Sequence, residues 1–228
     1  MYGGSVTSTF QRARSAEQRE IRRRAVLDTA SAMLDEMPVA AVSLNELSRR
    51  VGLAKSNVLR YFESREAVLL ELLDDYLGQW LVDVERGLDA WVRPGADVEE
   101  RAGQVADVLA RSLADRPVLL DLLAAQGGVL EHNLSVEGVK RHKRASLARL
   151  AAVAALLQRH LPELGDAAQS YGLMAVVSAG AVASYAPPPP VVHEALADDP
   201  ELAVFQVDVA GALRDVLGAL LVGRLPRD

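Results

Sequence analysis

Apolar residues recur at intervals of three and four along most of this 228-residue chain, and they rarely alternate with polar residues. The first spacing gathers them on one face of an α-helix, whereas a half-buried strand requires alternation. Capping residues, prolines and glycines divide the pattern into segments. We therefore predict an all-α fold with helices at approximately residues 17–37, 43–50, 55–62, 64–93, 97–116, 117–126, 135–160, 166–185 and 199–223.

Composition narrows the classes of function and the compartment. The chain has no cysteine, which excludes a disulfide scaffold, a thiolate nucleophile and a cysteine-ligated metal site. Its first eleven residues lead into no apolar segment of the kind that directs secretion, so we expect a cytoplasmic protein. Residues 167–192 carry no charge, but their polar side chains and terminal prolines favour a buried helix over a membrane span.

The formal net charge of −6 hides an uneven distribution. Residues 1–66 carry 11 Lys and Arg against 8 Asp and Glu, whereas residues 67–228 carry 14 against 23. Because phosphate binding needs local positive potential, any contact with nucleic acid is expected in the first segment and not in the acidic remainder.

Two short predicted helices with a glycine between them lie inside the basic segment. Ser43 and Glu46 form a capping-box pattern at the start of the first helix, because the serine hydroxyl can accept a backbone N–H and the glutamate can reach back. Gly52 can adopt the positive φ of a tight turn before the second helix. Helix, short turn and helix is the spacing of a helix-turn-helix, whose second helix lies in the DNA major groove.

The second of these helices has a polar outer face. Asn and Arg can pair with adenine and guanine edges, while Lys and Ser contact phosphates or bases. Arginines along and before the first helix would add contacts to the backbone or minor groove. The alternative is a solvated polar helix without a ligand. The predicted DNA-facing residues are Lys55, Ser56, Asn57 and Arg60, supported by Arg12, Arg14, Arg19, Arg22, Arg23 and Arg24.

Residues 42–67, VSLNELSRRVGLAKSNVLRYFESREA, resemble the DNA-binding signature of TetR/AcrR-type bacterial regulators. The shared order is a capped helix, a glycine-hydrophobic turn, a recognition helix ending in an aromatic pair, and a polar entry to a long helix. The resemblance is strong over about residues 17–72 and only architectural beyond. It implies a flexible basic arm at 1–16, a DNA-binding domain at 17–63, and a ligand-binding and dimerisation domain at 64–228.

The resemblance also implies further DNA contacts. Ser43 and Asn45 would lie at the edge of the groove, and Tyr61 and Arg65 would contact backbone phosphates. Leu59 departs from the family pattern, which commonly places a phosphate-contacting tyrosine there. We expect it to touch a thymine methyl or to pack in the core instead.

A homodimer and a small-molecule cavity are implied for the rest of the chain. An effector in the cavity would tilt the helix at 64–91 and change the separation of the two recognition helices. The last two predicted helices would form half of an intermolecular four-helix bundle, with packing inside one chain as the alternative. The expected cavity residues are Tyr76, Trp80, Leu123, Gln126, His142, Tyr171 and Met174, and the expected interface residues are Val176, Ala179, Ala183, Val209, Leu213, Val216 and Leu220.

The predicted function is a cytoplasmic, ligand-responsive transcription regulator, a repressor by the family's usual mode, that binds an inverted-repeat DNA operator as a homodimer and needs no cofactor. An enzyme is one alternative, but the common phosphate-loop, nucleophile-elbow, dinucleotide and zinc-protease motifs are absent from the sequence. The other alternative is an all-α small-molecule sensor or partner-binding bundle without sequence-specific DNA binding. The histidines show no i,i+4 pairing, so no metal site is expected.

Overall fold

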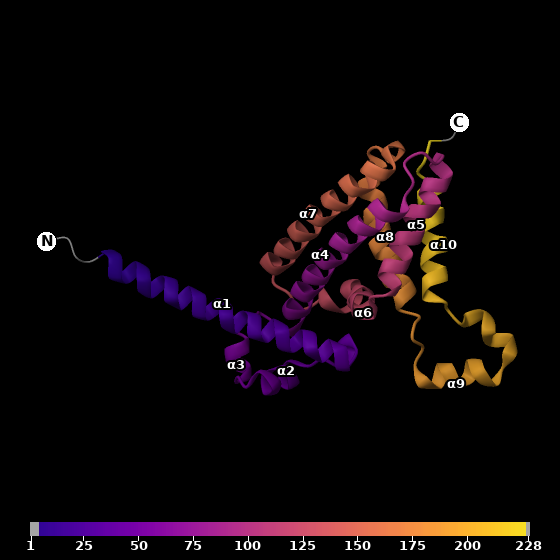
Figure 1. The fold of residues 1–228 in the computed structure, drawn as a ribbon. Helices are drawn as coiled ribbons and strands as arrows, with labels where there is room; N and C mark the ends of the chain where they lie inside the picture. The colour runs from indigo at the N-terminus through magenta and orange to yellow at the C-terminus, as the bar shows by residue number, and fades with distance from the viewer. Residues whose placement is uncertain (1–4, 227–228) are drawn as a thin grey trace.

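The computed structural model describes residues 5–226, with the side chains of residues 16–226. Its helices are α1 (Ser5–Glu36), α2 (Leu44–Val51), α3 (Lys55–Val58), α4 (Arg65–Trp91), α5 (Val98–Ala114), α6 (Pro117–Ala125), α7 (Val136–His160), α8 (Ala167–Ala183), α9 (Pro190–Asp198) and α10 (Val209–Val222) (Figure 1). No β-strand occurs in residues 5–226, which confirms the all-α prediction. None of the described helices is long and apolar enough to cross a membrane.

Helices α1 to α3 form the small domain at the amino-terminal end, which we call the head (Figure 1). The Ser43 hydroxyl accepts the backbone N–H of Glu46 and so caps α2 as predicted, although the Glu46 side chain pairs with arginines instead of reaching back. Gly52 ends α2 at φ 73°, the left-handed conformation that the turn required. Leu47, Val58 and Phe62 are buried between the helices, so a small apolar core fixes how α3 is presented.

Two boundaries in the head differ from the prediction. Helix α1 begins at Ser5 and not near Glu17, so most of the segment expected as a flexible arm has helical backbone in the structure. The second helix of the motif was expected to span residues 55–62. The α-helix ends at Val58, and tighter turns carry the chain to Phe62, with the Arg60 and Tyr61 amides donating three residues back.

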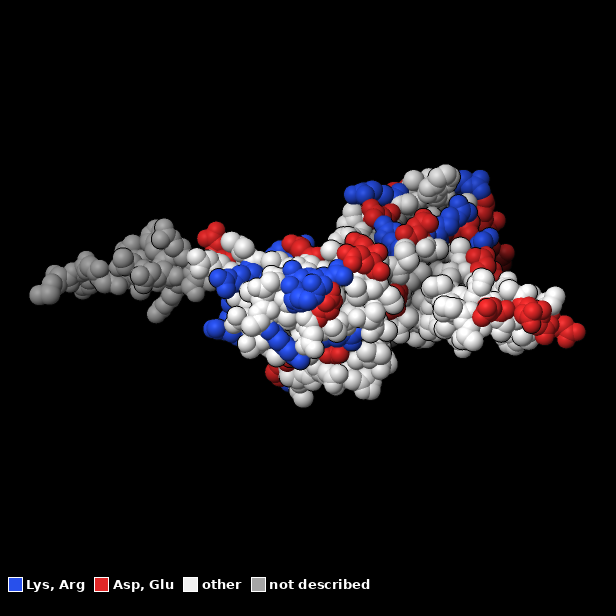
Figure 2. Space-filling model, turned by 90° about the horizontal axis from the view of Figure 1, so that it is seen from below, with Lys and Arg blue, Asp and Glu red and all other residues white. Residues whose placement is uncertain are grey.

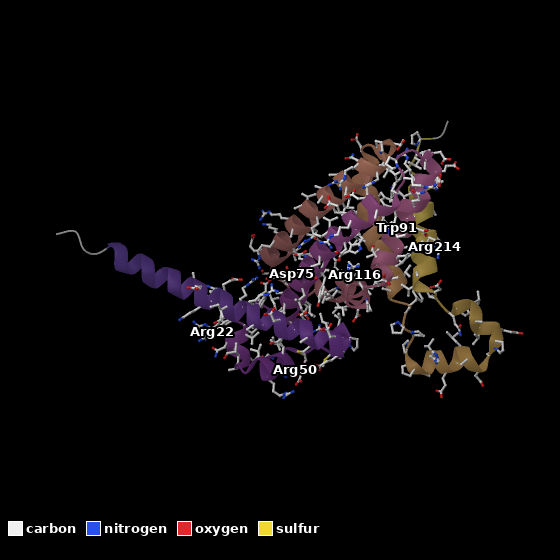
Figure 3. All side chains as sticks on the ribbon, in the orientation of Figure 1. Arg22, Arg50, Asp75, Trp91, Arg116 and Arg214 are labelled. Atoms are coloured by element: carbon white, nitrogen blue, oxygen red, sulfur yellow. The ribbon has the colours of Figure 1, made fainter. Side chains whose placement is uncertain are left out.

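Helix α4 connects the head to the larger helical body. The Ser64 hydroxyl caps its first turn, and its apolar side chains Leu69, Leu73, Val84 and Leu88 are fully buried. Trp91, the last residue of the helix, is instead 71% exposed (Figure 3).

The body is a bundle in which each helix has several neighbours. Helix α4 packs against α5, α6 and α7, while α8 lies among α6, α7 and α10 (Figure 1). Helix α10 also packs extensively on α5. Between α6 and α7 the chain forms a single π-helical turn, η2 (Gln126–Leu130), at the glycine pair that the sequence marked as a helix end. The buried apolar side chains of head and body form one continuous cluster.

The segment between α8 and α10 differs most from the prediction. One helix was expected from Asp199, but Asp199 and Pro200 begin only a 3₁₀ turn, η4 (Pro200–Phe205), and Asp208 caps α10 by accepting the Gly211 amide. Two Asp caps therefore compete in the sequence, and the second starts the long helix. Residues 187–208, which we call the excursion, contain α9 and protrude from the body (Figure 1). The only buried apolar side chain in the excursion is outside the main core.

Candidate nucleic-acid interface and cavity

Helix α3 and the turn after it present the predicted polar face to solvent. The side chains of Lys55, Ser56, Asn57 and Arg60 are all exposed, whereas Val58 between them is fully buried and anchors the helix. Among the residues whose side chains are described, none makes a hydrogen bond or ion pair with the side chains of these four. The groups available together for an external partner are thus the ammonium of Lys55, the hydroxyl of Ser56, the side-chain amide of Asn57 and the guanidinium of Arg60.

The arginines of α1 have different surroundings. Arg19 donates to the Arg60 carbonyl across 3.4 Å, which places it beside the recognition segment, and Arg22 projects from the same helix into solvent (Figure 3). Arg23 instead pairs with Glu71 and lies 4.9 Å from the centre of the Phe62 ring, so it fastens α1 to α4. Arg24 pairs with Asp28, and the side chains of Arg12 and Arg14 lie outside the described residues.

Apart from Arg65, the positions that the family resemblance singles out are exposed or half-buried. Ser43 and Asn45 are exposed at the start of α2, and Tyr61 is half-buried behind α3. Leu59 is 42% exposed, so of the two roles expected for it the structure favours a surface contact over the core.

Arg65 requires a correction. Its guanidinium donates to the backbone carbonyls of Val39 and Val42 and pairs with Glu66 at 3.3 Å, and its side chain is only 17% exposed. Those donors satisfy the loop before α2, so they are not available to a phosphate. We therefore remove Arg65 from the predicted DNA-binding set and assign it to the support of the head.

Charge on the face that carries α2 and α3 is mixed but locally basic. Figure 2 shows Lys and Arg grouped over the head and Asp and Glu gathered at the tip of the excursion. Within the head, Glu46 accepts hydrogen bonds from Arg49 and Arg50, which lower the pKa of its carboxyl to about 2. Those two arginines are therefore partly neutralised, whereas Lys55 on α3 and Arg60 just after it have no ion-pair partner among the described residues.

A cavity of about 590 Å³ lies between α4, α6, η2, α7 and α8 in the body. Its lining is mostly aliphatic, with a minority of polar and charged side chains from η2 and the residue after it, from α7, and from the residue after α8. A cavity of this size and character is suited to a small organic ligand.

The structure brings three of the seven expected cavity residues together. Trp80, Leu123 and Gln126 line the cavity, and His142 lies just behind it, with its Nε2 3.1 Å from the Gln126 amide nitrogen. The other three lie elsewhere: Tyr76 hydrogen-bonds Ser31 of α1 at 2.7 Å, Tyr171 is fully buried against α10, and the partly exposed Met174 is outside the lining. Burial raises the pKa of Tyr171 above its ordinary value, so the phenol stays protonated.

Sequence reasoning missed the lining residues on α7. Lys143, Ser146 and Arg149 follow the helical interval of three that a single face requires. This spacing is visible in the sequence, but it does not show what the face contacts. Only the position of α7 beside α4 makes it a cavity wall.

The expected interface residues are largely occupied within one chain. Ala179, Ala183 and Leu213 are buried, because α8 and α10 pack on each other and on α5 or α6. Val176 lines the cavity, and Val209, Val216 and Leu220 are half-buried. The half-buried positions and the exposed Val222 of α10 remain accessible to a second chain.

Head and body are joined by a direct contact away from α4. The backbone N–H of Val39, in the 3₁₀ turn η1 (Val39–Ala41), donates to the Asp121 carboxylate of α6 at 2.7 Å. Helix α6 continues into η2 and contributes Leu123 to the cavity. The loop before α2 is therefore held from two sides, by Asp121 of α6 and by Arg65 of α4.

Two family descriptions match this chain, and together they cover most of it. Residues 26–72 match "Bacterial regulatory proteins, tetR family", and residues 74–228 match "Tetracyclin repressor-like, C-terminal domain". The boundary between them falls inside α4, after the buried Leu72 and Leu73.

Individual relatives are more distant. The HTH-type transcriptional regulator EthR of Mycobacterium tuberculosis (strain ATCC 25618 / H37Rv) is 38% identical over 65 residues, which span 28% of this chain and 29% of that relative's length. The fatty acid degradation regulator FadR from Bacillus halodurans shares the fold, with TM-score 0.52 and 15% identity over 90% of this chain and 97% of that one. A TetR transcriptional regulator from Rhodococcus sp. RHA1 is similar, with TM-score 0.51, 16% identity and coverage of 90% and 98%.

Proposed function

Because this chain belongs to the TetR family of bacterial regulatory proteins, we propose that it is a ligand-responsive transcriptional repressor that binds an inverted-repeat operator as a homodimer. One observation carries the proposal: Lys55, Ser56, Asn57 and Arg60 are all exposed on one small buried-core scaffold. These four residue types supply both base-edge and phosphate contacts from a single short element.

Dimerisation would make operator binding sensitive to small displacements of the helices that carry the head. Two recognition helices must lie about 34–36 Å apart, or a further whole turn of DNA, to reach successive half-sites. A displacement of α4 or α6 in each chain would therefore lose contacts at both half-sites together. The Val39–Asp121 hydrogen bond and the Arg65 contacts supply the connection from the cavity wall to the head. An effector that binds only one spacing shifts the population toward it.

The test is selection of bound duplexes from a random DNA library by the full chain at near-physiological salt, because low salt favours non-specific binding. We expect enrichment of an inverted repeat. A Lys55→Ala/Asn57→Ala/Arg60→Ala variant should lose that enrichment. The matched control, Lys140→Ala/Arg144→Ala/Gln169→Ala, removes exposed side chains of the same kinds from the body and should retain it.

The same selection distinguishes the proposed regulator from the alternative, a helical sensor without sequence-specific DNA binding. A helical sensor that does not read DNA would enrich no sequence and would show the same residual affinity in both triple variants. Light scattering on the same samples should give twice the chain mass of 24.5 kDa for the free protein. A monomer at the concentrations used for selection would contradict the proposed dimer.

A further inference from the structure

The cavity in the body separates its lining by polarity, and from this we infer the class of effector: an elongated apolar molecule that ends in a carboxylate, bound by Arg149. The inference deepens the proposed function, and rests on it for its regulatory meaning. The binding itself is a property of the chain and can be measured without DNA.

One end of the cavity is aliphatic. Leu150 and Val153 of α7 line it together with Leu77 and Leu81 of α4. Helices α7 and α8 approach each other tightly beside this end, because a Cβ on Gly172 of α8 would lie 3.1 Å from Val153 Cγ1. An alkyl or similar apolar chain placed here leaves water for a surface without hydrogen-bonding groups. Each buried methylene then strengthens binding about fourfold.

The polar residues gather at the other end, nearer the head. They come from η2 and the residue after it, from the first half of α7, and from Ser184 just after α8, which runs antiparallel to α7. Lys143 Nζ lies 2.6 Å from Glu131 Oε1. Burial raises the pKa of the Glu131 carboxyl, but hydrogen bonds from Lys143 and Gln126 outweigh it and hold the pKa below its ordinary value. Lys143 therefore already has an anionic partner.

Arg149 lies between the two ends, and its hydrogen-bonding capacity is unused. Its Nε is buried without a hydrogen-bond partner, 3.5 Å from the similarly unbonded Asp74 Oδ1. No side chain or backbone group in the described part of the chain accepts a hydrogen bond from its guanidinium. Asp74 thus offsets part of the charge but takes none of the donors.

A glycine in the neighbouring helix leaves room for the Arg149 side chain. Its Nη1 occupies the space beside Gly78 of α4, where a Cβ would be only 2.8 Å away. The side chain is 29% exposed and lines the cavity. A guanidinium presents parallel donors whose spacing matches the two oxygens of a carboxylate, so a carboxylate is the head group that uses this geometry best.

The experiment compares three probes whose main chain has ten carbons, the carboxyl carbon of decanoate included, and whose heads differ: decanoate, decan-1-ol and decyltrimethylammonium. Calorimetric titration of the full chain should give the lowest Kd for decanoate and the highest for the cation. Extending decanoate to dodecanoate should tighten binding on the order of tenfold, because two more methylenes enter the aliphatic end.

Substitution then assigns the head group to its partner. Arg149→Gln should weaken decanoate about ten- to a hundredfold, since a charge-assisted hydrogen bond is lost, while decan-1-ol changes less than about threefold. Arg149→Lys should restore part of the affinity for decanoate. Arg144→Gln, the same change at an exposed position of α7 outside the cavity, should alter neither ligand.

Each outcome decides the inference. Equal affinity for the three heads, preference for the cation, no binding of any probe, or an equal loss of decanoate and decan-1-ol in Arg149→Gln would overturn it. Where Arg149→Gln fails to fold, the comparison of head groups on the unsubstituted protein still decides. Failure here leaves operator selection untouched, whereas failure of operator selection by the ligand-free chain, with decanoate binding still measured, would contradict the proposed function and leave this ligand class standing.

Discussion

Lys55 and Arg65 are both cations of the head, ten positions apart, and the structure gives them opposite surroundings. Lys55 is exposed without a described partner, whereas the Arg65 guanidinium satisfies two backbone carbonyls of the loop before α2. The family resemblance assigned both to DNA. Whether a side chain meets solvent or a neighbouring loop depends on residues distant in sequence, so motif spacing alone could not separate them.

This difference predicts unequal effects on stability. Arg65→Met should lower the free energy of unfolding by about 2–4 kcal/mol, because two carbonyls lose a charged donor in a half-buried site. Lys55→Met, the matched change at the surface, should alter it by less than about 0.5 kcal/mol. Urea unfolding followed by circular dichroism measures both. Equal effects of the two substitutions would contradict the supporting role of Arg65.

Glu46 predicts a pH dependence that can be assigned to one group. Its arginine partners lower its pKa from 4.5 to about 2 in the folded chain. A depressed carboxyl pKa stabilises the fold fully above the unfolded value, and that contribution is lost as the pH falls from 4.5 toward 2. Thermal unfolding at pH 6, 5, 4 and 3 should therefore show a difference between the unsubstituted chain and Glu46→Gln that narrows below pH 4.5. A difference independent of pH would refute the assignment.

At the scale of elements, caps and breaks were predictable because they depend on a few adjacent residues. Ser43, Ser64 and Asp97 cap the helices that were predicted to begin at residues 43, 64 and 97, and Gly52 adopts the expected positive φ. The end of α8 and the start of α10 were not, because prolines and two Asp caps offer several local solutions. Packing on α5 and α8 selects among them, and that packing has no local signature.

The closeness of α8 to α6 gives a test at this scale. A Cβ on Gly180 would lie 2.7 Å from the Leu123 carbonyl oxygen, which is backbone and cannot move aside. Gly180→Ala should therefore destabilise the chain by about 1–3 kcal/mol through overpacking. Gly103→Ala, in an exposed position of α5 with open space around it, should stabilise by about 0.5–1 kcal/mol.

The two glycine variants share one readout, the urea unfolding midpoint with the slope unchanged. Stabilisation by both would mean that α8 and α6 separate without cost. Gly180 and Leu123 both line the cavity, so the Gly180→Ala substitution also changes its shape. Ligand titration on the same sample reports that change.

For the whole molecule, the basic head and the acidic body separate the two partners proposed for the chain. The sequence located the cation excess correctly in residues 1–66, but it could not locate the cavity, whose walls come from five segments between Leu77 and Ser184. Surface charge follows from a list of residues, whereas an enclosed volume follows from how helices pack. The exposure of the basic recognition segment was accordingly easier to predict than the cavity lining, while its contact with DNA stays a prediction.

A salt titration tests the head as part of a dimer. Each Lys55 that neutralises a phosphate contributes about 0.9 to the slope of log Kd against log salt, and a dimer carries two. Lys55→Ala should therefore lower the magnitude of that slope by about 2 on the selected operator. Lys140→Ala, a body lysine paired with Glu137, should leave it unchanged. A decrease near 1 would indicate a single bound head.

The hydrogen bond from Val39 to Asp121 has a consequence for how the proposed repressor would be titrated in a cell. Coupling between two sites is a property of the pair, so a link by which an effector weakens operator binding must let the operator weaken effector binding by the same factor. Protein bound to its operator would then bind the effector only at a higher effector concentration than free protein requires. The free pool acts as a buffer, and induction begins after that pool has filled.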